Sequence, residues 1–451
     1  MTDIDNLTAL GIAGEIWHGR MSAAQVTEAF LARIAAEQPA LNAFVEVYAE
    51  DARRAAAAAD AQIAAGYRLG PLHGVPVVVK DLVDWQGRRT SGGTKAHADR
   101  IARATAPIIR HMLAQGMIIL GKTQTVEFAF GGWGTNPGMG TPVNPWDREV
   151  HRVPGGSSSG TAVAVAAGLA PWGIGTDTGG SVRLPAAFCG LVGLKTTGGG
   201  IDTAGIQPLS PSLDTVGPLA RSVADAAVLD HVLRGLPVPD LPPEALVGAI
   251  APDLERGVAG LRLGSLPASE RDGVEGDMLE AYDATLERLA GLGATITPVS
   301  LPFAIGEMVE ANGVIMAAEA YAIHGVLADD AAQPLGDAVR ARVRAGRDIR
   351  AADYIAALQG RATLSRAYTR ATAGLDAVIT PSMRAAAIQV SAVDEAVSPA
   401  HFTRFGNYLD LCAAVAPNGM SGDGMPLSAQ TVCASHREHM ALRIAATQVM
   451  P

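Results

Sequence analysis

Apolar residues recur at two different spacings along the chain, and each spacing predicts a different element. Near the N-terminus, Ser22 and Gln25 stand three residues apart as in a capping box, and apolar residues follow at helical intervals. The alanine-rich stretch 51–66 predicts a second helix that ends at Gly66. Short apolar runs follow, and they are typical of buried strands. The strand candidates are VPVVVK (75–80), MIIL (117–120), WGIGTD (172–177), LRLGSL (261–266), ATITPVSL (294–301) and DAVITPS (376–382).

Helical segments alternate with these strands without an internal repeat, including a long charged segment from Pro334 to Ala373. This order predicts an α/β fold, with one mixed, twisted β-sheet covered by helices on both faces. No Pro/Ser-rich linker divides the chain, and glycines gather between Gly131 and Gly200, inside the strand and helix pattern. We therefore expect a single large domain over residues 1–451, with unusual backbone geometry at a site in its glycine-rich part.

Composition narrows the class of protein. The 451 residues are 48% hydrophobic and 18% charged, as in a globular protein with a large core, and the net charge is −10. A negative charge argues against nucleic acid or an anionic membrane surface as the main partner. The acidic start lacks the pattern of a signal peptide, so we expect a cytoplasmic protein. Cys189, Cys412 and Cys433 have no metal-ligand spacing, and we expect reduced thiols, no metal and no cofactor.

Two short motifs match known catalytic patterns by their letters alone. GMIILGKT (116–123) fits the phosphate-binding P-loop, but its variable positions are apolar strand formers, so we interpret it as a core strand that ends in a surface lysine. GSSSG (156–160) fits a nucleophile elbow centred on Ser158. The stretch before it holds three prolines and several charges, which a buried strand would not tolerate. We therefore reject both matches.

A third candidate site combines separate segments. Lys80 closes the valine run 77–79, and burial at the end of a strand lowers the pKa of a lysine towards the range of a general base. The strand 172–177 runs into a turn in which Gly179 and Gly180 precede Ser181. Glycines there allow successive backbone N–H groups to converge on one point, as an oxyanion hole requires. The Gly/Ser loop that contains Ser157 is the remaining piece.

Taken in this order, the segments resemble the amidase signature family of serine hydrolases. The resemblance covers nearly the whole chain and is densest between residues 69 and 229. It is carried by GVPVVVKD (74–81), NPWDREVHRVPGGSSSGTAVAVAAG (144–168), GTDTGGSVRLPAAFCGLVGLK (175–195) and PLSPSLDTVGPLARSVADAA (208–227), with a weaker similarity in GMPLSAQ (424–430). The family implies a division into an N-terminal helical arm (1–66), a signature core (67–230) and a variable helical region on the substrate side (296–375).

The resemblance implies a Ser–cisSer–Lys triad. It places the nucleophile on Ser181, the bridging serine on Ser157 after a cis peptide bond, and the base on Lys80. The implied oxyanion donors are the backbone N–H groups of Thr178, Gly179, Gly180 and Ser181. We assign supporting roles to three more residues, namely Ser158, as a helix cap or a partner of Lys80, and Asp177 with Arg183, as a pair that fixes the nucleophile turn. Cys189 has apolar neighbours and is expected to be an inert, buried thiol.

The resemblance further implies a stand-alone amidase that acts on a C–N bond of a small-molecule amide through an acyl-enzyme, as a monomer or homodimer. Its variable segments (125–139, 303–327 and 402–411) carry apolar and aromatic residues, and no Lys/Arg cluster stands out. We expect hydrophobic or aryl amides, with carbamates (urethanes) or esters as further possibilities, in a pocket that includes Phe128, Trp133, Met316 and Tyr321. The alternative is an amidotransferase-type subunit that supplies ammonia to a partner. Leu82, where that subgroup has Asn, favours the hydrolase.

Overall fold

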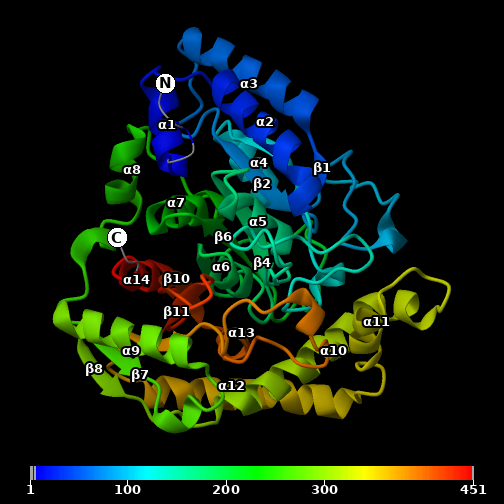
Figure 1. Ribbon diagram of the computed structural model, residues 1–451, viewed down its shortest axis with the longest axis vertical. Coiled ribbons are helices and arrows are strands. Elements are labelled where there is room, and N and C mark those ends of the chain that lie inside the picture. The colour runs from blue at the N-terminus through cyan, green and yellow to red at the C-terminus, as the bar shows by residue number, and fades with distance from the viewer. Residues whose placement is uncertain (1–3, 5–6, 449–451) are drawn as a thin grey trace.

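A single mixed sheet organises the protein (Figure 1), which is described by a computed structural model for residue 4 and residues 7–448. Eleven strands lie in the order β1-β3-β2-β4-β6-β5-β10-β11-β9-β7-β8. Parallel pairs join β3, β2 and β4 and again β9, β7 and β8, whereas the pairs from β4 to β9 are antiparallel. The strands are β1 (Phe44–Val47), β2 (Pro76–Lys80), β3 (Ile118–Thr123), β4 (Trp172–Asp177), β5 (Val192–Lys195), β6 (Thr215–Ala220), β7 (Arg262–Ser265), β8 (Thr295–Pro298), β9 (Ala377–Pro381), β10 (Cys412–Met420) and β11 (Pro426–Cys433).

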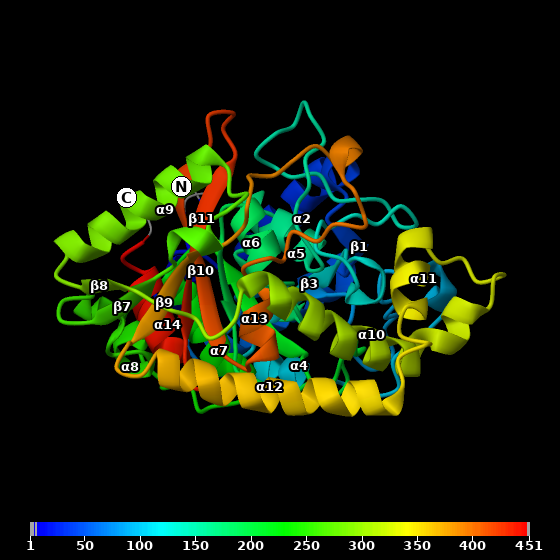
Figure 2. The same cartoon turned by 90° about the horizontal axis from the view of Figure 1, so that it is seen from below.

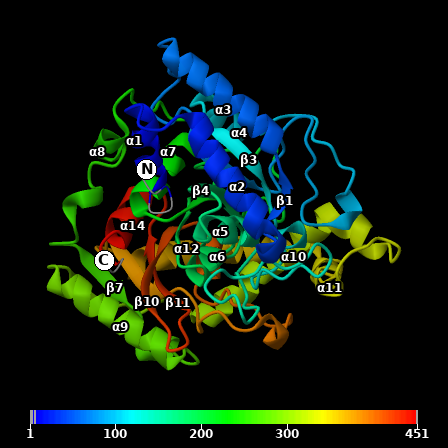
Figure 3. The same cartoon turned by 45° about the horizontal axis from the view of Figure 1, so that its top comes forward.

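Helices cover both faces of this sheet, as the sequence predicted. In Figures 2 and 3, α4, α7 and α14 lie on one face, and α5, α6 and α9 lie on the other. The helices are α1 (Ala9–Trp17), α2 (Ala23–Leu41), α3 (Ala49–Ala64), α4 (Pro107–Ala114), α5 (Ser159–Ala166), α6 (Arg183–Phe188), α7 (Val223–Leu233), α8 (Pro243–Ile250), α9 (Gly276–Gly291), α10 (Ile305–Asp329), α11 (Asp337–Arg344), α12 (Ala351–Ala371), α13 (Arg404–Tyr408) and α14 (Glu438–Ala445).

All six strand candidates are strands, and they correspond to β2, β3, β4, β7, β8 and β9. The capping box at the start of α2 is also confirmed, since the Ser22 hydroxyl accepts from the Gln25 N–H and the Gln25 side chain accepts from the Ser22 N–H. Five strands had not been predicted, namely β1, β5, β6, β10 and β11. Glycine or proline interrupts the apolar run in most of them, as in TVGPLA and CAAVAPNGM, which conceals the strand pattern.

Two sequence-based expectations are wrong, namely a single helical segment over residues 334–373 and a surface position for Lys122. The charged segment from Pro334 to Ala373 forms two helices, α11 and α12, because the chain turns at Gly346. A Cβ at Gly346 would stand 1.9 Å from the carbonyl oxygen of Ala317 in α10, which shows how closely the turn packs. Lys122 in the P-loop-like segment is buried instead of lying on the surface. Its ammonium donates to the Thr90 hydroxyl at 2.8 Å and to Asp81 at 3.4 Å, so a carboxylate compensates for the burial.

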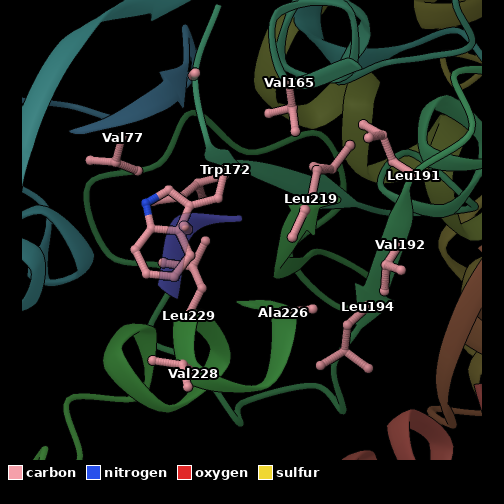
Figure 4. Close-up of a cluster of buried hydrophobic side chains, with 14 of the residues drawn as sticks. Val77, Val165, Trp172, Leu191, Val192, Leu194, Leu219, Ala226, Val228 and Leu229 are labelled. Carbon is pink, nitrogen blue, oxygen red and sulfur yellow. The ribbon is translucent and has the colours of Figure 1, made fainter. Parts of the chain in front are cut away.

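The core beside β2 and β4 fixes the positions of the strand ends. Trp172 is fully buried among aliphatic side chains such as Val77, Leu219 and Leu229 (Figure 4), and its indole N–H donates to the Pro76 carbonyl at 2.9 Å. β2 and β4 are parallel neighbours, so their carboxyl ends lie at the same edge of the sheet. β2 ends at Lys80 and β4 ends at Asp177, and the candidate site forms at this edge.

Helices α10, α11, α12 and α13 form a second layer beside the sheet (Figure 2). α10 packs against α11, α12 and α13. Within the described part of the chain, α10 is the one helix whose length and composition would suit a membrane span, and 44% of its most apolar window is buried inside the protein. Its apolar residues Met308, Ile315 and Met316 belong to a core shared with Phe402, Phe405 and Tyr408. This core holds α10 against the segment around α13.

Candidate active site

Lys80 and Ser157 form the centre of the site. The Lys80 Nζ lies 2.7 Å from Ser157 Oγ and 2.8 Å from Thr176 Oγ1, and both Lys80 and Ser157 are fully buried. These two hydroxyls are neutral, whereas an ammonium group carries three N–H donors and a charge. The environment therefore favours the neutral amine over the ammonium ion.

The electrostatics of Lys80 follow from this burial. Loss of water around the amine lowers the pKa of Lys80 to about 7, although the more distant negative charges of Asp177 and Asp214 act in the opposite direction. At pH 7 about half of the Lys80 side chains are then neutral, compared with about 1 in 3,000 for a lysine of ordinary pKa. A neutral lysine in contact with a serine hydroxyl is equipped to accept its proton.

The Ser157 loop and the nucleophile turn are joined through their backbones. The Gly156–Ser157 peptide bond is cis, as the family resemblance implied. The Ser157 carbonyl accepts from the Val126 N–H at 3.1 Å, and the Ser158 N–H donates to the Ser181 carbonyl at 3.2 Å. Ser181 is 7% exposed and lines a cavity, whereas Ser157 is fully buried and does not line it. The structure thus brings Lys80, Ser157 and Ser181 to one place, with Ser181 towards the cavity.

Ser158 differs from both expected roles. Helix α5 begins at Ser159, and the Ser158 side chain makes no capping hydrogen bond and none with Lys80. Its hydroxyl instead contacts the backbone of Thr176, donating to the carbonyl at 3.4 Å and accepting from the N–H at 3.3 Å. The loop is packed against β4, so the hydroxyl reaches strand backbone before it reaches the helix end. The Ser159 hydroxyl is buried and has no hydrogen-bond partner.

Asp177 organises the nucleophile turn. Its carboxylate accepts from the backbone N–H groups of Gly180 at 2.8 Å, Val182 at 3.0 Å and Arg183 at 3.3 Å. The Arg183 guanidinium adds two hydrogen bonds, at 3.1 and 2.9 Å, and Asp177 and Arg183 are both fully buried. Burial alone would raise the pKa of Asp177, but the charge and hydrogen bonds of Arg183 outweigh it and hold the pKa below its usual range. The buried pair therefore fixes the turn in one conformation.

The hydrogen bond from Gly180 corrects the expected oxyanion hole. Because the Gly180 N–H is already bonded to Asp177, it is not available to an oxyanion. The N–H groups of Thr178, Gly179 and Ser181 have no such partner within the described residues, so they remain the candidate donors. Gly180 has another function in the turn, since its φ is +136° and a Cβ there would lie 2.3 Å from Thr403 Oγ1. The sequence revealed a glycine turn but not which N–H group faces inward.

Ser181 opens onto a cavity of about 490 Å³, within the usual size range of small-molecule pockets. Trp133 and Met316 line it as predicted, whereas Phe128 and Tyr321 do not. Phe128 is buried and stacks on His324 with ring centroids 4.1 Å apart, and the Tyr321 hydroxyl bonds to Asp329 on the outer side of α10. The lining combines apolar with charged side chains: Ala129, Phe130, Trp133, Leu184, Leu209, Met316, Ala338, Ala341, Arg342, Ala345, Glu395, Ala396, Val397, Ala400 and Arg404, besides the polar Thr178 and Ser398.

Several site residues had not been predicted. Thr176 holds Lys80 through its hydroxyl, and it stands in the quoted motif GTDTGGS, where a polar residue on a buried strand was the available signal. Asn407 donates to both the carboxylate and the backbone carbonyl of Asp177, and it comes from a distant part of the chain. Arg342 and Arg404 enter the cavity from separate helices, so no cluster of basic residues is visible in the sequence.

Two further features concern Cys189 and possible metal ligands. Cys189 is fully buried, its Sγ contacts the Pro154 carbonyl at 3.3 Å, and burial raises the pKa of the thiol far above its usual range. In residue 4 and residues 7–448, no group of three or more His, Cys, Asp or Glu side chains is arranged to hold a metal ion.

A mixed sheet with a Lys–Ser pair and a serine-bearing glycine turn at its edge is the architecture of a known class of enzymes. The chain belongs to the amidase family, whose model matches residues 25–442. It is 43% identical over 312 residues to a glutamyl-tRNA(Gln) amidotransferase subunit from Salinispora arenicola (strain CNS-205), a match over 67% of this chain and 62% of that protein, which is less than two thirds of its length. It is 36% identical over 408 residues to the 2-amino-5-chloromuconic acid deaminase of Comamonas testosteroni, over 87% of this chain and 85% of that protein.

The similarity extends to solved structures over the whole fold. A crystal structure of an amidase superposes with a TM-score of 0.88 at 31% identity, covering 98% of this chain and 99% of that chain. The peptide amidase of Stenotrophomonas maltophilia superposes with a TM-score of 0.84 at 29% identity, covering 98% of this chain and 96% of that chain. The sequence-based assignment of family and fold class is thereby confirmed.

Proposed function

We propose that the protein hydrolyses a C–N bond of a small amide, with Ser181 as nucleophile, Ser157 as proton bridge and neutral Lys80 as general base. The observation that carries this proposal is the contact of 2.7 Å between the fully buried Lys80 amine and Ser157 hydroxyl, in a loop that is hydrogen-bonded to the backbone of Ser181. A lysine held neutral beside a serine has no evident structural purpose, since a hydrophobic residue would fill the same space at lower cost.

The reaction proceeds by two acyl transfers. As the Ser181 oxygen attacks the amide carbonyl, its proton passes to Ser157, and the Ser157 proton passes to Lys80. The backbone N–H groups of Thr178, Gly179 and Ser181 stabilise the oxyanion. The proton then returns through Ser157 to the departing nitrogen. The nitrogen leaves as ammonia or an amine, and the acyl group stays on Ser181 as an ester. Water attacks the ester by the same relay, releasing the carboxylic acid and restoring the starting protonation.

The lining of the cavity supports the substrate class only in part. Phe130, Trp133, Leu184 and Met316 provide an apolar wall that would accommodate a hydrophobic or aryl group. Amides with such groups, carbamates and esters stay predictions of the sequence that need direct measurement. A panel of p-nitroanilides, aliphatic amides, carbamates and esters, assayed with the purified chain, would rank these classes by kcat/KM.

Substitution of individual serines tests the assignment of roles. Ser181→Ala should reduce kcat by about 10⁴-fold or more while leaving the fold intact, and Lys80→Met should come close to this loss. Ser159→Ala is the matched control, because the Ser159 hydroxyl lies next to the same loop but has no hydrogen-bond partner. If Ser158→Ala were inactive while Ser181→Ala retained activity, the nucleophile would be Ser158 and the proposed relay would be wrong.

A second function is favoured by the similarity to amidotransferase subunits, which match this chain at up to 43% identity. In that case the chain would release ammonia to a partner protein instead of into solution. Gel filtration together with an ammonia-release assay separates the two functions. Activity of the isolated chain on simple amides supports the stand-alone amidase, whereas activity that requires an added partner protein supports the amidotransferase role.

A further inference from the structure

Arg404 lies in the wall of the cavity, and its guanidinium has no acidic partner among residue 4 and residues 7–448. Arg404, the first residue of α13, donates from Nη1 to the Val309 carbonyl at 3.0 Å and from Nη2 to the Ser398 hydroxyl at 3.2 Å. Its Nε is buried and has no hydrogen-bond partner. Burial, and then the nearby charge of Arg342, lower the pKa of Arg404 to about 10, so the group remains charged at neutral pH.

The other charges of the cavity do not compensate Arg404. Arg342 also lines the cavity, but it forms an ion pair with Glu395 and donates to the Phe130 carbonyl at 2.8 Å. Glu395 is therefore engaged by Arg342. The cavity wall holds two arginines and one glutamate, which leaves one positive charge unmatched. Buried charges in proteins are normally paired or bound to a ligand of opposite charge.

Arg404 is close to the nucleophile turn. A Cβ placed on Gly179 would lie 3.3 Å from Arg404 Cγ and 3.5 Å from Asn312 Oδ1. The neighbouring Thr403 hydroxyl donates to the Gly179 carbonyl at 2.7 Å, which holds α13 against the turn. Asn312 of α10 is fully buried, and both polar atoms of its amide lack a hydrogen-bond partner. The stem of Arg404 and the Asn312 amide thus both pack against Gly179, two positions before Ser181 in the chain, and of the two only Arg404 lines the cavity.

We propose that the substrate carries a carboxylate that binds to Arg404, while its scissile amide lies at Ser181. This inference rests on the proposed amide hydrolysis and names its substrate class, namely monoamides of small dicarboxylic acids whose connecting segment packs on the apolar wall. A carboxylate matches a single unpaired guanidinium in charge, whereas a phosphate dianion would exceed it. This proposal differs from the sequence-based expectation of an uncharged hydrophobic or aryl amide.

Matched substrate pairs test the proposal. The series from malonamate to adipamate would be compared with uncharged primary amides of equal chain length, by ammonia release. In the unmodified protein, kcat/KM should favour at least one acid over its neutral counterpart by roughly 10- to 100-fold, the range that a charge-assisted hydrogen bond supplies. Arg404→Gln should remove most of this preference through a higher KM for the acid, and Arg404→Lys should restore part of it. Arg366→Gln, on the exposed side of α12, is the control and should leave the preference unchanged.

A binding measurement separates failure of this inference from failure of the proposed function. In the Ser181→Ala protein, calorimetry should detect the preferred monoamide, and the additional Arg404→Gln substitution should weaken binding by the same 10- to 100-fold. If the unmodified protein released no ammonia from any amide of the series, binding that depends on Arg404 would still support the anion site, while the missing activity would contradict the hydrolase. Equal kcat/KM for acids and neutral amides, or an acid preference that survives both Arg404 substitutions in folded protein, would overturn the carboxylate site.

Discussion

The pH dependence of the reaction tests the role of Lys80 most directly. If neutral Lys80 is the base, kcat/KM must fall as the pH drops through the pKa of Lys80, which burial lowers to about 7. The neutral fraction is about one half at pH 7, about 9% at pH 6 and about 1% at pH 5. The rate should therefore fall by about tenfold for each pH unit below 6 and reach a plateau above pH 8. A lysine of ordinary pKa would give no plateau below pH 10.

The assay uses an uncharged primary amide, so that the substrate does not titrate, with ammonia release measured at intervals from pH 5 to 9. The carboxyl of Asp214 complicates the interpretation, because burial raises its pKa to about 6. Asp214→Asn distinguishes the two groups, since the Asp214 charge raises the pKa of Lys80. If Lys80 controls the rate, the substitution moves the acid limb to lower pH; if Asp214 controls it, the limb disappears.

Lys80→Arg keeps a positive charge that cannot be lost, and it should be inactive at every pH. A wild-type rate that stays constant from pH 5 to 9 would refute the reasoning.

Further expectations concern stability. Arg183→Met leaves the Asp177 carboxylate buried without its partner and should lower the free energy of unfolding by about 3–5 kcal/mol in urea titrations, so a change below about 1 kcal/mol would contradict the structural role. Gly180→Ala places a Cβ 2.3 Å from Thr403 Oγ1 at a φ of +136°. We expect the free energy of unfolding to fall by about 1–3 kcal/mol, together with a reduced kcat. An unchanged melting temperature would show that the turn is not fixed as described. Trp172→Ala removes the largest fully buried side chain and should cost about 3–5 kcal/mol, while the kcat of the folded fraction in the same preparation stays near that of the unmodified protein.

The sequence predicted those parts of the site in which residue type and local context coincide. Lys80 ends an uninterrupted valine run, and Ser181 follows two glycines after a strand, so both the elements and the chemistry could be recognised. The local hydrogen bonds could not be predicted from the sequence. Ser158 contacts the backbone of Thr176, and the Gly180 N–H points to Asp177, because the packing of the loop against β4 decides which of several polar groups meet. Sequence patterns report periodicity and residue type, and they carry no information about such choices.

The residues of the cavity were harder to foresee because they come from distant segments. Arg404 and Gly179 are neighbours through Thr403, whose contact with Gly179 spans 224 positions of the chain. Trp133 and Met316 were correctly placed in the cavity, but Phe128 and Tyr321, chosen by the same criterion of aromatic or apolar type, point elsewhere. Residue type alone did not separate a side chain that lines the cavity from one that fills the core.

The segment at α13 contacts both the turn that carries Ser181 and the wall of the cavity. Asn407 and the Thr403 carbonyl bind the buried pair of Asp177 and Arg183, so this face of the helix holds the nucleophile turn. Arg404, one residue along, is directed to the cavity. Because these contacts use different side chains, we expect a substitution at position 404 to change the cavity wall while Thr403 and Asn407 continue to hold the turn. If Arg404 binds the substrate as proposed, substrate class and the geometry of the Ser181 turn can change independently, although Thr403, Arg404 and Asn407 lie within five consecutive positions.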